Sequence, residues 1–257
     1  MLILLSPAKT LNPTNPEAHS IVELTSPVFL NEVEKLTQAL SQWDLTTTMA
    51  RLKLSENMAK RAMEWHKSWQ RQGGHAAGWT FQGDAFKSLD LPSFADEHVW
   101  AAQRRLRILN GAYGLLRPLD RYRPVRLEMG LNWCPFEGVK NMTHYWRPKL
   151  NAQLALESSE IGTSRILNLA SSEYGDVALH GRPMSDVVSC VFLEIKGGKH
   201  RSISAYAKAA RGAMARFVLT NDIDHPNQLS HFDGLGYAYS GELSSRGKKV
   251  FTRTLRP

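Results

Sequence analysis

The sequence has few cysteines and no long hydrophobic run. Two cysteines among 257 residues are too few for a disulfide framework or a thiol-rich zinc site, and they fit a reducing compartment. The apolar start at residues 1–5 has no basic segment before it and ends at Pro7, so it is too short for a signal peptide. No apolar run approaches the roughly 20 residues that cross a bilayer. We therefore expect a cytoplasmic protein with no membrane association.

The sequence also lacks the common enzyme signatures. It contains no phosphate-binding P-loop, no His-Glu-x-x-His zinc motif and no G-x-S-x-G nucleophile elbow. Its nine histidines are scattered, without the close spacing of metal ligands. We accordingly predict no metal site, no cofactor and no obligate protein partner.

The chain is rich in apolar residues and in positive charge. Its 42% apolar and 22% charged residues are ordinary for a globular protein, and 257 residues lie near the upper limit for one hydrophobic core. We predict a single α/β domain over residues 1–257, with residues 28–110 as a candidate helical subdomain.

The net charge of +8 is concentrated in three segments. Residues 101–126 contain seven arginines and one acid, residues 196–216 contain six cations and no acid, and residues 246–257 contain five cations and no acid. Such segregation is typical of a surface that binds a polyanion, and it indicates nucleic acid as the partner. The alternative is that the excess charge only aids solubility.

Hydrophobic periodicity predicts that helices and strands alternate along the chain. The predicted helices are residues 29–43, 55–69, 96–109, 142–157 and 205–219. The predicted strands are residues 2–5, 165–169, 187–195, 200–206, 237–239 and 250–255, of which the third and fourth form a hairpin. Interleaved elements favour a mixed sheet covered by helices on both faces.

A lysine follows the first predicted strand. Lys9 stands four residues beyond residues 2–5, and ligands of open α/β sheets gather beyond the carboxyl ends of strands. A lysine at this place can meet a phosphate as a point charge. The alternative is a solvated loop residue.

Two glycines three residues apart interrupt the arginine-rich segment. A predicted helix runs into Gly111 and Gly114, and another apolar segment follows. This pattern predicts a helix–hairpin–helix element, in which glycines let backbone N–H groups approach a phosphate. The alternative is a glycine C-cap followed by a loop. The residues expected beside the phosphate are Tyr113, Arg117, Arg121, Arg123 and Arg126.

The predicted helix at residues 205–219 combines small residues with cations. Its alanines permit close packing against a sheet or another backbone, whereas Lys208, Arg211 and Arg216 project elsewhere and have no acids near them in sequence. We predict that these cations face nucleic acid, the alternative being a solvated cationic face.

Carboxylates also recur at predicted turns and strand ends, namely Asp84, Glu128 and Glu173. Together with Lys9, they could perform acid–base chemistry or bind a divalent ion. Their ordinary roles are capping and pairing with arginine. The alternatives to a nucleic-acid-binding protein are therefore an enzyme acting on a nucleotide or nucleic acid, or a sensor of a small anion or metabolite.

Taken together, these segments resemble the YaaA family of bacterial peroxide-stress proteins. The matching segments are LILLSPAKT (2–10), FQGDAF (81–86), LNGAYGLLRPLD (109–120), RLEMG (126–130), NLASSEY (168–174) and YAKAARGAMARF (206–217). The resemblance implies a compact α/β fold, a positively charged cleft, a helix–hairpin–helix element and DNA binding. It also implies a role in limiting hydrogen-peroxide damage that is linked to free intracellular iron.

The resemblance also implies which residues line the cleft. By motif they are Lys9, Tyr113, Arg117, Arg126, Lys208, Arg211 and Arg216. Gln82 and Ala209 stand where the family pattern leads us to expect lysines. Two fewer cations would weaken DNA binding or shorten the stretch of DNA that the protein contacts. The leading hypothesis is a non-catalytic protein that holds double-stranded or structurally distorted DNA through its phosphates, largely without reading sequence. An enzymatic activity stays open.

Overall fold

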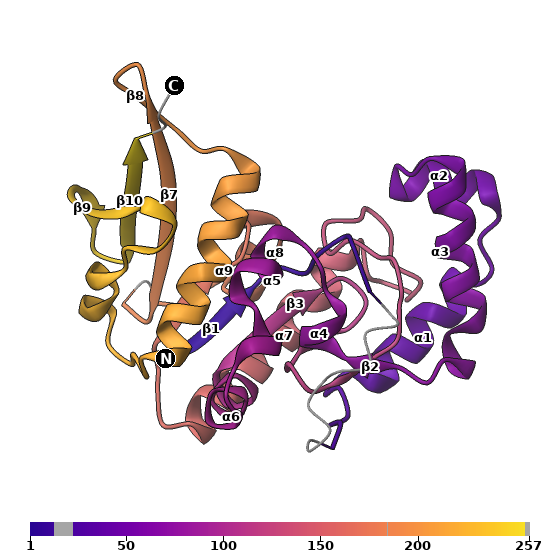
Figure 1. The fold of residues 1–257 in the computed structure, drawn as a ribbon. Coiled ribbons are helices and arrows are strands. Elements are labelled where there is room, and N and C mark those ends of the chain that lie inside the picture. The colour runs from indigo at the N-terminus through magenta and orange to yellow at the C-terminus, as the bar shows by residue number, and fades with distance from the viewer. Residues whose placement is uncertain (13–22, 184, 255–257) are drawn as a thin grey trace.

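The computed structural model describes residues 1–12, 23–183 and 185–254 (Figure 1). An eight-stranded mixed sheet forms its centre, in the order β4-β3-β1-β6-β7-β10-β9 with β8 paired to β7. Its strands are β1 (Leu2–Leu5), β3 (Leu106–Asn110), β4 (Gly114–Leu116), β6 (Ile166–Leu169), β7 (Val187–Lys196), β8 (Lys199–Arg201), β9 (Ala238–Ser245) and β10 (Lys248–Thr254). A separate two-stranded sheet pairs β2 (His75–Ala76) with β5 (Arg121–Tyr122).

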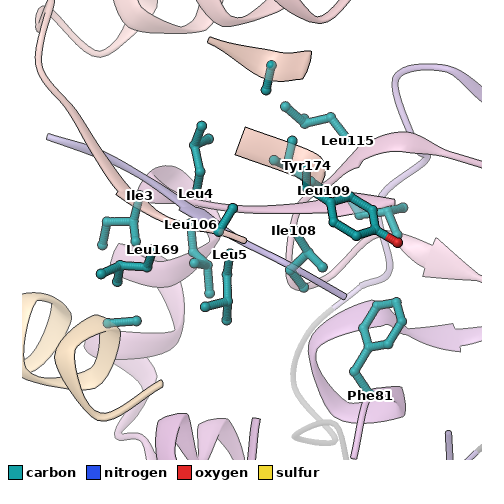
Figure 2. Close-up of a cluster of buried hydrophobic side chains, with 14 of the residues drawn as sticks. Ile3, Leu4, Leu5, Phe81, Leu106, Ile108, Leu109, Leu115, Leu169 and Tyr174 are labelled. Atoms are coloured by element: carbon teal, nitrogen blue, oxygen red, sulfur yellow. The ribbon is translucent and has the colours of Figure 1, made fainter. Parts of the chain in front are cut away.

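The middle of the large sheet is parallel. β1 pairs in parallel with β3 and β6, β6 with β7, and β7 with β10, while β4, β8 and β9 are antiparallel additions. Every residue of β1 and β3 is buried, which requires cover on both faces of the sheet. Their side chains pack with Leu169 and Tyr174 in one apolar cluster (Figure 2). Because β1, β3 and β6 run in one direction, their carboxyl ends meet at one edge.

The helices pack on the sheet in two groups. α5 (Asp84–Leu89) and α6 (Asp96–Arg105) pack with α9 (Ser204–Thr220), which also contacts β1, β6 and β7. α7 (Met142–Glu160) packs with α8 (Ser172–Ala178), and these two helices contact β4 and β3. The predicted mixed sheet flanked by helices is confirmed.

A glycine brings α9 very close to α5. A Cβ atom on Gly212 would stand 1.8 Å from the carbonyl oxygen of Ala85. Ala207 and Ala210 are also buried on this helix. The small residues of α9 therefore serve close packing, as their pattern in the sequence predicts.

The N-terminal helices form the far end of the molecule from β8, β9 and β10 (Figure 1). α3 (Glu56–Ser68) packs against α1 (Leu30–Leu40) and α2 (Leu45–Leu52). α2 begins at Asp44, whose carboxylate accepts a hydrogen bond from the Thr47 backbone N–H at 2.7 Å, and it ends at Lys53 with φ of 52°. The shorter elements are η1 (Trp69–Arg71), α4 (Ala77–Thr80), η2 (Leu91–Ser93), η3 (Pro226–His231) and η4 (Gly234–Gly236).

Residues 106–116 form a strand pair, so the prediction of a helix–hairpin–helix element there is wrong. The predicted helix at 96–109 ends at Arg105, and the next five residues pair in parallel with β1. β4 then turns back against β3 through a turn closed by Asn110, whose Oδ1 accepts hydrogen bonds from two backbone N–H groups. An apolar run of this length fits a buried strand as well as a helix, and pairing with β1 decides between them.

The other helices predicted from the sequence, at 29–43, 55–69, 142–157 and 205–219, occur within three residues of the predicted bounds. The hairpin is also present, as β7 and β8. α2 was not predicted. In α3 the buried positions are Ala59, Ala62 and His66, while Met58 is exposed and Trp65 is half-buried.

Candidate functional site

A cavity of about 590 Å³, here called the strand-end cavity, lies beyond the carboxyl ends of β1, β3 and β6. Residues 5–11 follow β1 into it, Asn110 ends β3 there, and Ser171, Glu173 and Tyr174 follow β6. β1 and β6 are neighbours in the sheet. The strand of this sheet that follows β1 in the chain is β3, on the side of β1 away from β6, and the strand that follows β6 is β7, on the side of β6 away from β1. Neighbouring strands with connections in opposite directions leave a crevice between their loops, which is where ligands of α/β sheets bind.

The strand-end cavity gathers seven of the fourteen site residues that we proposed from the sequence. The four residues of the enzyme hypothesis, Lys9, Asp84, Glu128 and Glu173, all line it. Three predicted nucleic-acid-binding cations line it as well, namely Arg126, Lys208 and Arg211. These side chains come from the loops after β1 and β6, the start of α5, the segment after β5, and α9.

A second cavity of about 720 Å³, here called the α2–α3 cavity, adjoins the first. It shares Lys9, Arg126, Glu128 and Glu173 with the strand-end cavity, and α2, α3 and the turn between them supply its other wall. The residues from that wall are Arg51, Leu52, Lys53, Leu54 and Met58. The sequence did not lead us to predict Arg51 and Lys53 as site residues because α2 itself was not predicted. Asp44, a residue type that commonly caps the N-terminus of a helix, is the sequence feature that could have indicated α2.

Arg126 and Glu128 form an ion pair where the two cavities meet. An Nη atom of Arg126 lies 2.5 Å from Glu128 Oε1, while Glu128 Oε2 is buried and has no hydrogen-bond partner among the described residues. The backbone of Arg126 is held by His66, whose Nε2 lies 3.1 Å from the Arg126 carbonyl oxygen. His66 is 3% exposed, and burial lowers its pKa to about 4, so the ring is neutral near pH 7.

Arg211 is the least compensated arginine of the strand-end cavity. It is half-buried, its Nε atom has no hydrogen-bond partner, and no described carboxylate lies within ion-pair distance of it. Burial lowers the pKa of its guanidinium, and the neighbouring Cys190 thiol acts in the opposite direction. Lys208, one turn earlier on the same helix, is exposed and has no ion-pair partner in the described ranges either.

The arginines of the 104–126 segment are arranged differently. Arg107 and Arg117 both pair with Glu157, which is fully buried, the Arg117–Glu157 distance being 3.2 Å. Arg105 pairs with Asp222 at 2.8 Å. On α9, Arg216 lies 3.7 Å from Asp90. Each of these guanidinium groups has a carboxylate partner within the fold, and Arg107 and Arg117 share one.

The remaining predicted contacts lie away from both cavities. Tyr113 is fully buried and its hydroxyl is bonded to Trp69 and to the backbone of Arg123. Gly111 and Gly114 are buried, packed respectively against the Leu127 carbonyl and the Trp146 ring. Arg121 bonds the Gly73 carbonyl, and the Arg123 guanidinium lies 4.8 Å from the centre of the Trp69 ring. Of these residues, Gly111, Tyr113 and Gly114 are part of the core beside the cavity, and Arg121 and Arg123 lie outside it, so none of the five is among the lining residues.

The two thiols are poor nucleophiles. Cys190 is buried, which raises its pKa to about 12, and burial also raises the pKa of Cys134. Thiols with raised pKa values are protonated at neutral pH and react slowly with oxidants.

Among the described residues there is no group of three or more His, Cys, Asp and Glu side chains suited to hold a metal ion. Within the same ranges, every helix is too short or too polar to span a bilayer.

Comparison with known proteins places the chain in a family. The family model described as peroxide stress protein YaaA matches residues 1–243. The chain belongs to the YaaA family. Its YaaA-family relatives match over nearly their whole length: a UPF0246 protein of Hahella chejuensis is 37% identical, over 98% of this chain and 99% of that one. UPF0246 proteins of Idiomarina loihiensis and of a Ruegeria species are 36% and 38% identical, over 98% of this chain and 98% and 100% of theirs. Membership of the YaaA family supports a role in the response to peroxide stress.

Proposed function

We propose that this YaaA-family protein acts in the peroxide stress response by binding DNA, with the strand-end and α2–α3 cavities forming one basic cleft. The observation that supports this most is the charge of the lining residues. The two cavities are lined by seven cations and three carboxylates, a net charge of +4. The cations are Lys9, Arg51, Lys53, Lys87, Arg126, Lys208 and Arg211.

Six of these seven cations have no ion-pair partner among the described residues, Arg126 being the exception. Unpaired cations that line one concave surface add their potentials, and a polyanion that neutralises them releases its condensed counterions. Duplex or distorted DNA, held through its phosphates and largely without base reading, is the partner that fits this arrangement.

The α2–α3 turn would supply backbone contacts to the same DNA. Ser55 precedes α3 without a side-chain hydrogen bond to the first turn, so the N–H groups there have no side-chain cap. Lys53 stands beside them in the turn. A phosphate bound here would receive both backbone hydrogen bonds and a positive charge. DNA covered in this way would be shielded from oxidants formed during peroxide stress.

The test is fluorescence anisotropy over a salt series with a plain duplex, a bubbled duplex, a junction and a single strand. With four to six phosphate contacts, log affinity should fall against log salt with a slope of about −4 to −5. The Lys9→Gln/Lys208→Gln double variant should reduce the slope by about 2. The matched control is Lys199→Gln/Arg201→Gln, which removes the same charge from the exposed β7–β8 hairpin and should leave the slope unchanged. An affinity independent of salt would contradict the proposal.

A second candidate function is an enzyme acting on a nucleotide or nucleic acid. The observation that favours it is that Lys9 and the carboxylates Asp84, Glu128 and Glu173 line one cavity. Acid–base chemistry needs such groups around one substrate. Incubation of nucleotides and DNA with the protein, followed by mass spectrometry, should then show a product that the Asp84→Asn and Glu173→Gln variants no longer form. Unchanged substrate after prolonged incubation with the wild type would exclude this candidate.

A further inference from the structure

The charges of the strand-end cavity are distributed unequally between its two ends. Lys208 and Arg211 on α9, with Asp84 and Lys87 on α5, line this cavity alone, whereas Lys9, Arg126, Glu128 and Glu173 also line the α2–α3 cavity. The end at α5 and α9 therefore has three cations and one carboxylate, a net positive charge, whereas the end toward the N-terminal helices has two cations and two carboxylates. A ligand that fills the cavity would place its anionic group at α9 and its hydrogen-bond donors at the opposite end.

The cationic end is incomplete without an anion. A half-buried guanidinium normally has a carboxylate or phosphate partner, because an uncompensated charge in a partly dry site is costly. Arg211 has no such partner among the described residues, and its Nε atom is buried without a hydrogen bond. Lys208 lies three residues earlier, which puts both side chains on one face of the helix. A guanidinium fork with an ammonium group beside it suits a phosphate.

The rest of the wall suits a flat, partly apolar group. Trp65 and Tyr174 line the cavity with Leu5, Leu127 and Leu169. Trp65 is half-buried on α3, and the Arg61 guanidinium lies 5.0 Å from the centre of its ring. Inorganic phosphate would make no use of this wall, whereas a nucleobase stacks on aromatic rings.

The carboxylate end provides acceptors. Within the part of the chain that the structure describes, Glu128 Oε2 is buried without a hydrogen-bond partner, and Glu173 Oε1 lies 3.4 Å from the Gly130 backbone nitrogen. Base amino groups and sugar hydroxyls are donors that carboxylate oxygens accept. A cavity of about 590 Å³ is also within the range of small-molecule sites.

We propose that the strand-end cavity binds one nucleotide, with its phosphate on Arg211 and Lys208 and its base against the wall that contains Trp65. The nucleotide is either a free nucleoside monophosphate or a single nucleotide unstacked from DNA. The second source rests on the proposed function, because the DNA must first be held at the basic cleft. Enzymes and binding proteins that take one nucleotide out of a stack use pockets of this kind.

The first arm of the test is isothermal titration of the whole protein with AMP, adenosine, ribose 5-phosphate and inorganic phosphate. AMP should bind at least tenfold more tightly than any of the other three. Arg211→Gln and the exposed-site variant Lys208→Gln should each weaken AMP binding several-fold or more, and Arg201→Gln on β8 should not. Trp65→Leu should weaken AMP binding about tenfold and leave ribose 5-phosphate unaffected.

The second arm compares a fully paired duplex with the same duplex carrying one unpaired nucleotide, by anisotropy. If DNA is the source, the bulged duplex binds more tightly, and Arg211→Gln and Trp65→Leu remove that preference while paired-duplex binding persists. If AMP binds and no duplex does, this inference is supported and the proposed function is contradicted. The inference is overturned if AMP binds no more tightly than inorganic phosphate and the bulge confers no preference.

Discussion

Two basic regions of the molecule differ in whether their cations have carboxylate partners within the fold. In the 104–126 segment, Arg105, Arg107 and Arg117 reach Asp222 or Glu157. At the strand-end cavity, Lys9, Lys208 and Arg211 reach no carboxylate within the part of the chain that the structure describes. The segment with the most arginines is therefore not a binding surface as a whole, since three of its seven arginines are paired with carboxylates elsewhere in the fold, while Arg126 lines the two cavities. What distinguishes the cavity cations Lys9, Lys208 and Arg211 is that no described carboxylate lies within ion-pair distance of them, even though three carboxylates line the same cavity.

The reason lies in the position of each region in the sheet. Arg107 is part of β3, every residue of which is buried, so its guanidinium needs a buried counter-charge. Glu157 of α7 provides it. Lys9 and Lys208 lie beyond strand ends or on the exposed side of a helix, where water compensates their charge until a ligand arrives.

The largest expected effect comes from removing the buried counter-charge. Glu157→Gln leaves the buried Arg107 guanidinium without its carboxylate counter-charge, and we expect the free energy of unfolding to fall by about 3–5 kcal/mol. Urea denaturation followed by circular dichroism measures it. The control Glu160→Gln, on the exposed end of the same helix, should change stability by less than about 0.5 kcal/mol. If the Glu157→Gln and Glu160→Gln variants were equally stable, the buried arginines would not depend on their carboxylate partner, and the difference proposed between the two regions would be contradicted.

A pH effect is expected where the regions meet, at His66. The pKa of this ring is about 4 in the folded protein and about 6.5 when unfolded. Between these values the unfolded state binds one more proton, so stability is lost as pH falls from 6.5 to 4, by about 3 kcal/mol in total. Urea midpoints across this range should show the loss, and His66→Gln should flatten it. His144→Gln, at an exposed position, should leave the slope as it is in the wild type.

A smaller effect separates the two classes of cation in DNA binding. Lys208→Gln should make the slope of log affinity against log salt shallower by about 1. Arg117→Gln should leave the slope unchanged, because that guanidinium is paired with Glu157 and is not among the residues that line the two cavities. Anisotropy with one duplex across a salt series checks both. If Arg117→Gln produced the larger change, the arginine-rich segment would be the DNA-binding surface.

The smallest effect is expected at the thiols. Burial raises the pKa of Cys190 to about 12 and raises that of Cys134, so neither should react readily with hydrogen peroxide at pH 7. Thiol titration after peroxide treatment should recover both cysteines of the folded protein. The Cys134→Ser variant should bind DNA as the wild type does. Rapid loss of one thiol would point to direct peroxide sensing.

Local patterns predicted most of the sheet and its covering helices. β1 and β6 are short apolar runs, and α9 has helical spacing with small residues on its packed side. The prediction failed at Leu106–Asn110, where the apolar run continues a helix without a break and only pairing with β1 makes it a strand. α2 was missed because its threonine-rich sequence has low helix propensity and owes its stability to α3.

The site could be predicted in part for a similar reason. Residues at strand ends, such as Lys9 and Glu173, are found from the parallel-sheet rule alone. Arg51 and Trp65 face the site only because the N-terminal helices pack next to it. The pair of Arg117 with Glu157 joins residues 40 positions apart, and no periodicity in the sequence carries that information.

The contact between Gly212 and Ala85 has a consequence for the ligand. Asp84 and Lys87 lie on α5, and Lys208 and Arg211 lie on α9, so the separation of these helices sets the distance between two walls of the cavity. A methyl group at Gly212 would collide with the Ala85 carbonyl and act as a wedge between the two walls. The width of the cavity between α5 and α9 thus depends on a residue that has no side chain and is not among the residues that line the cavity.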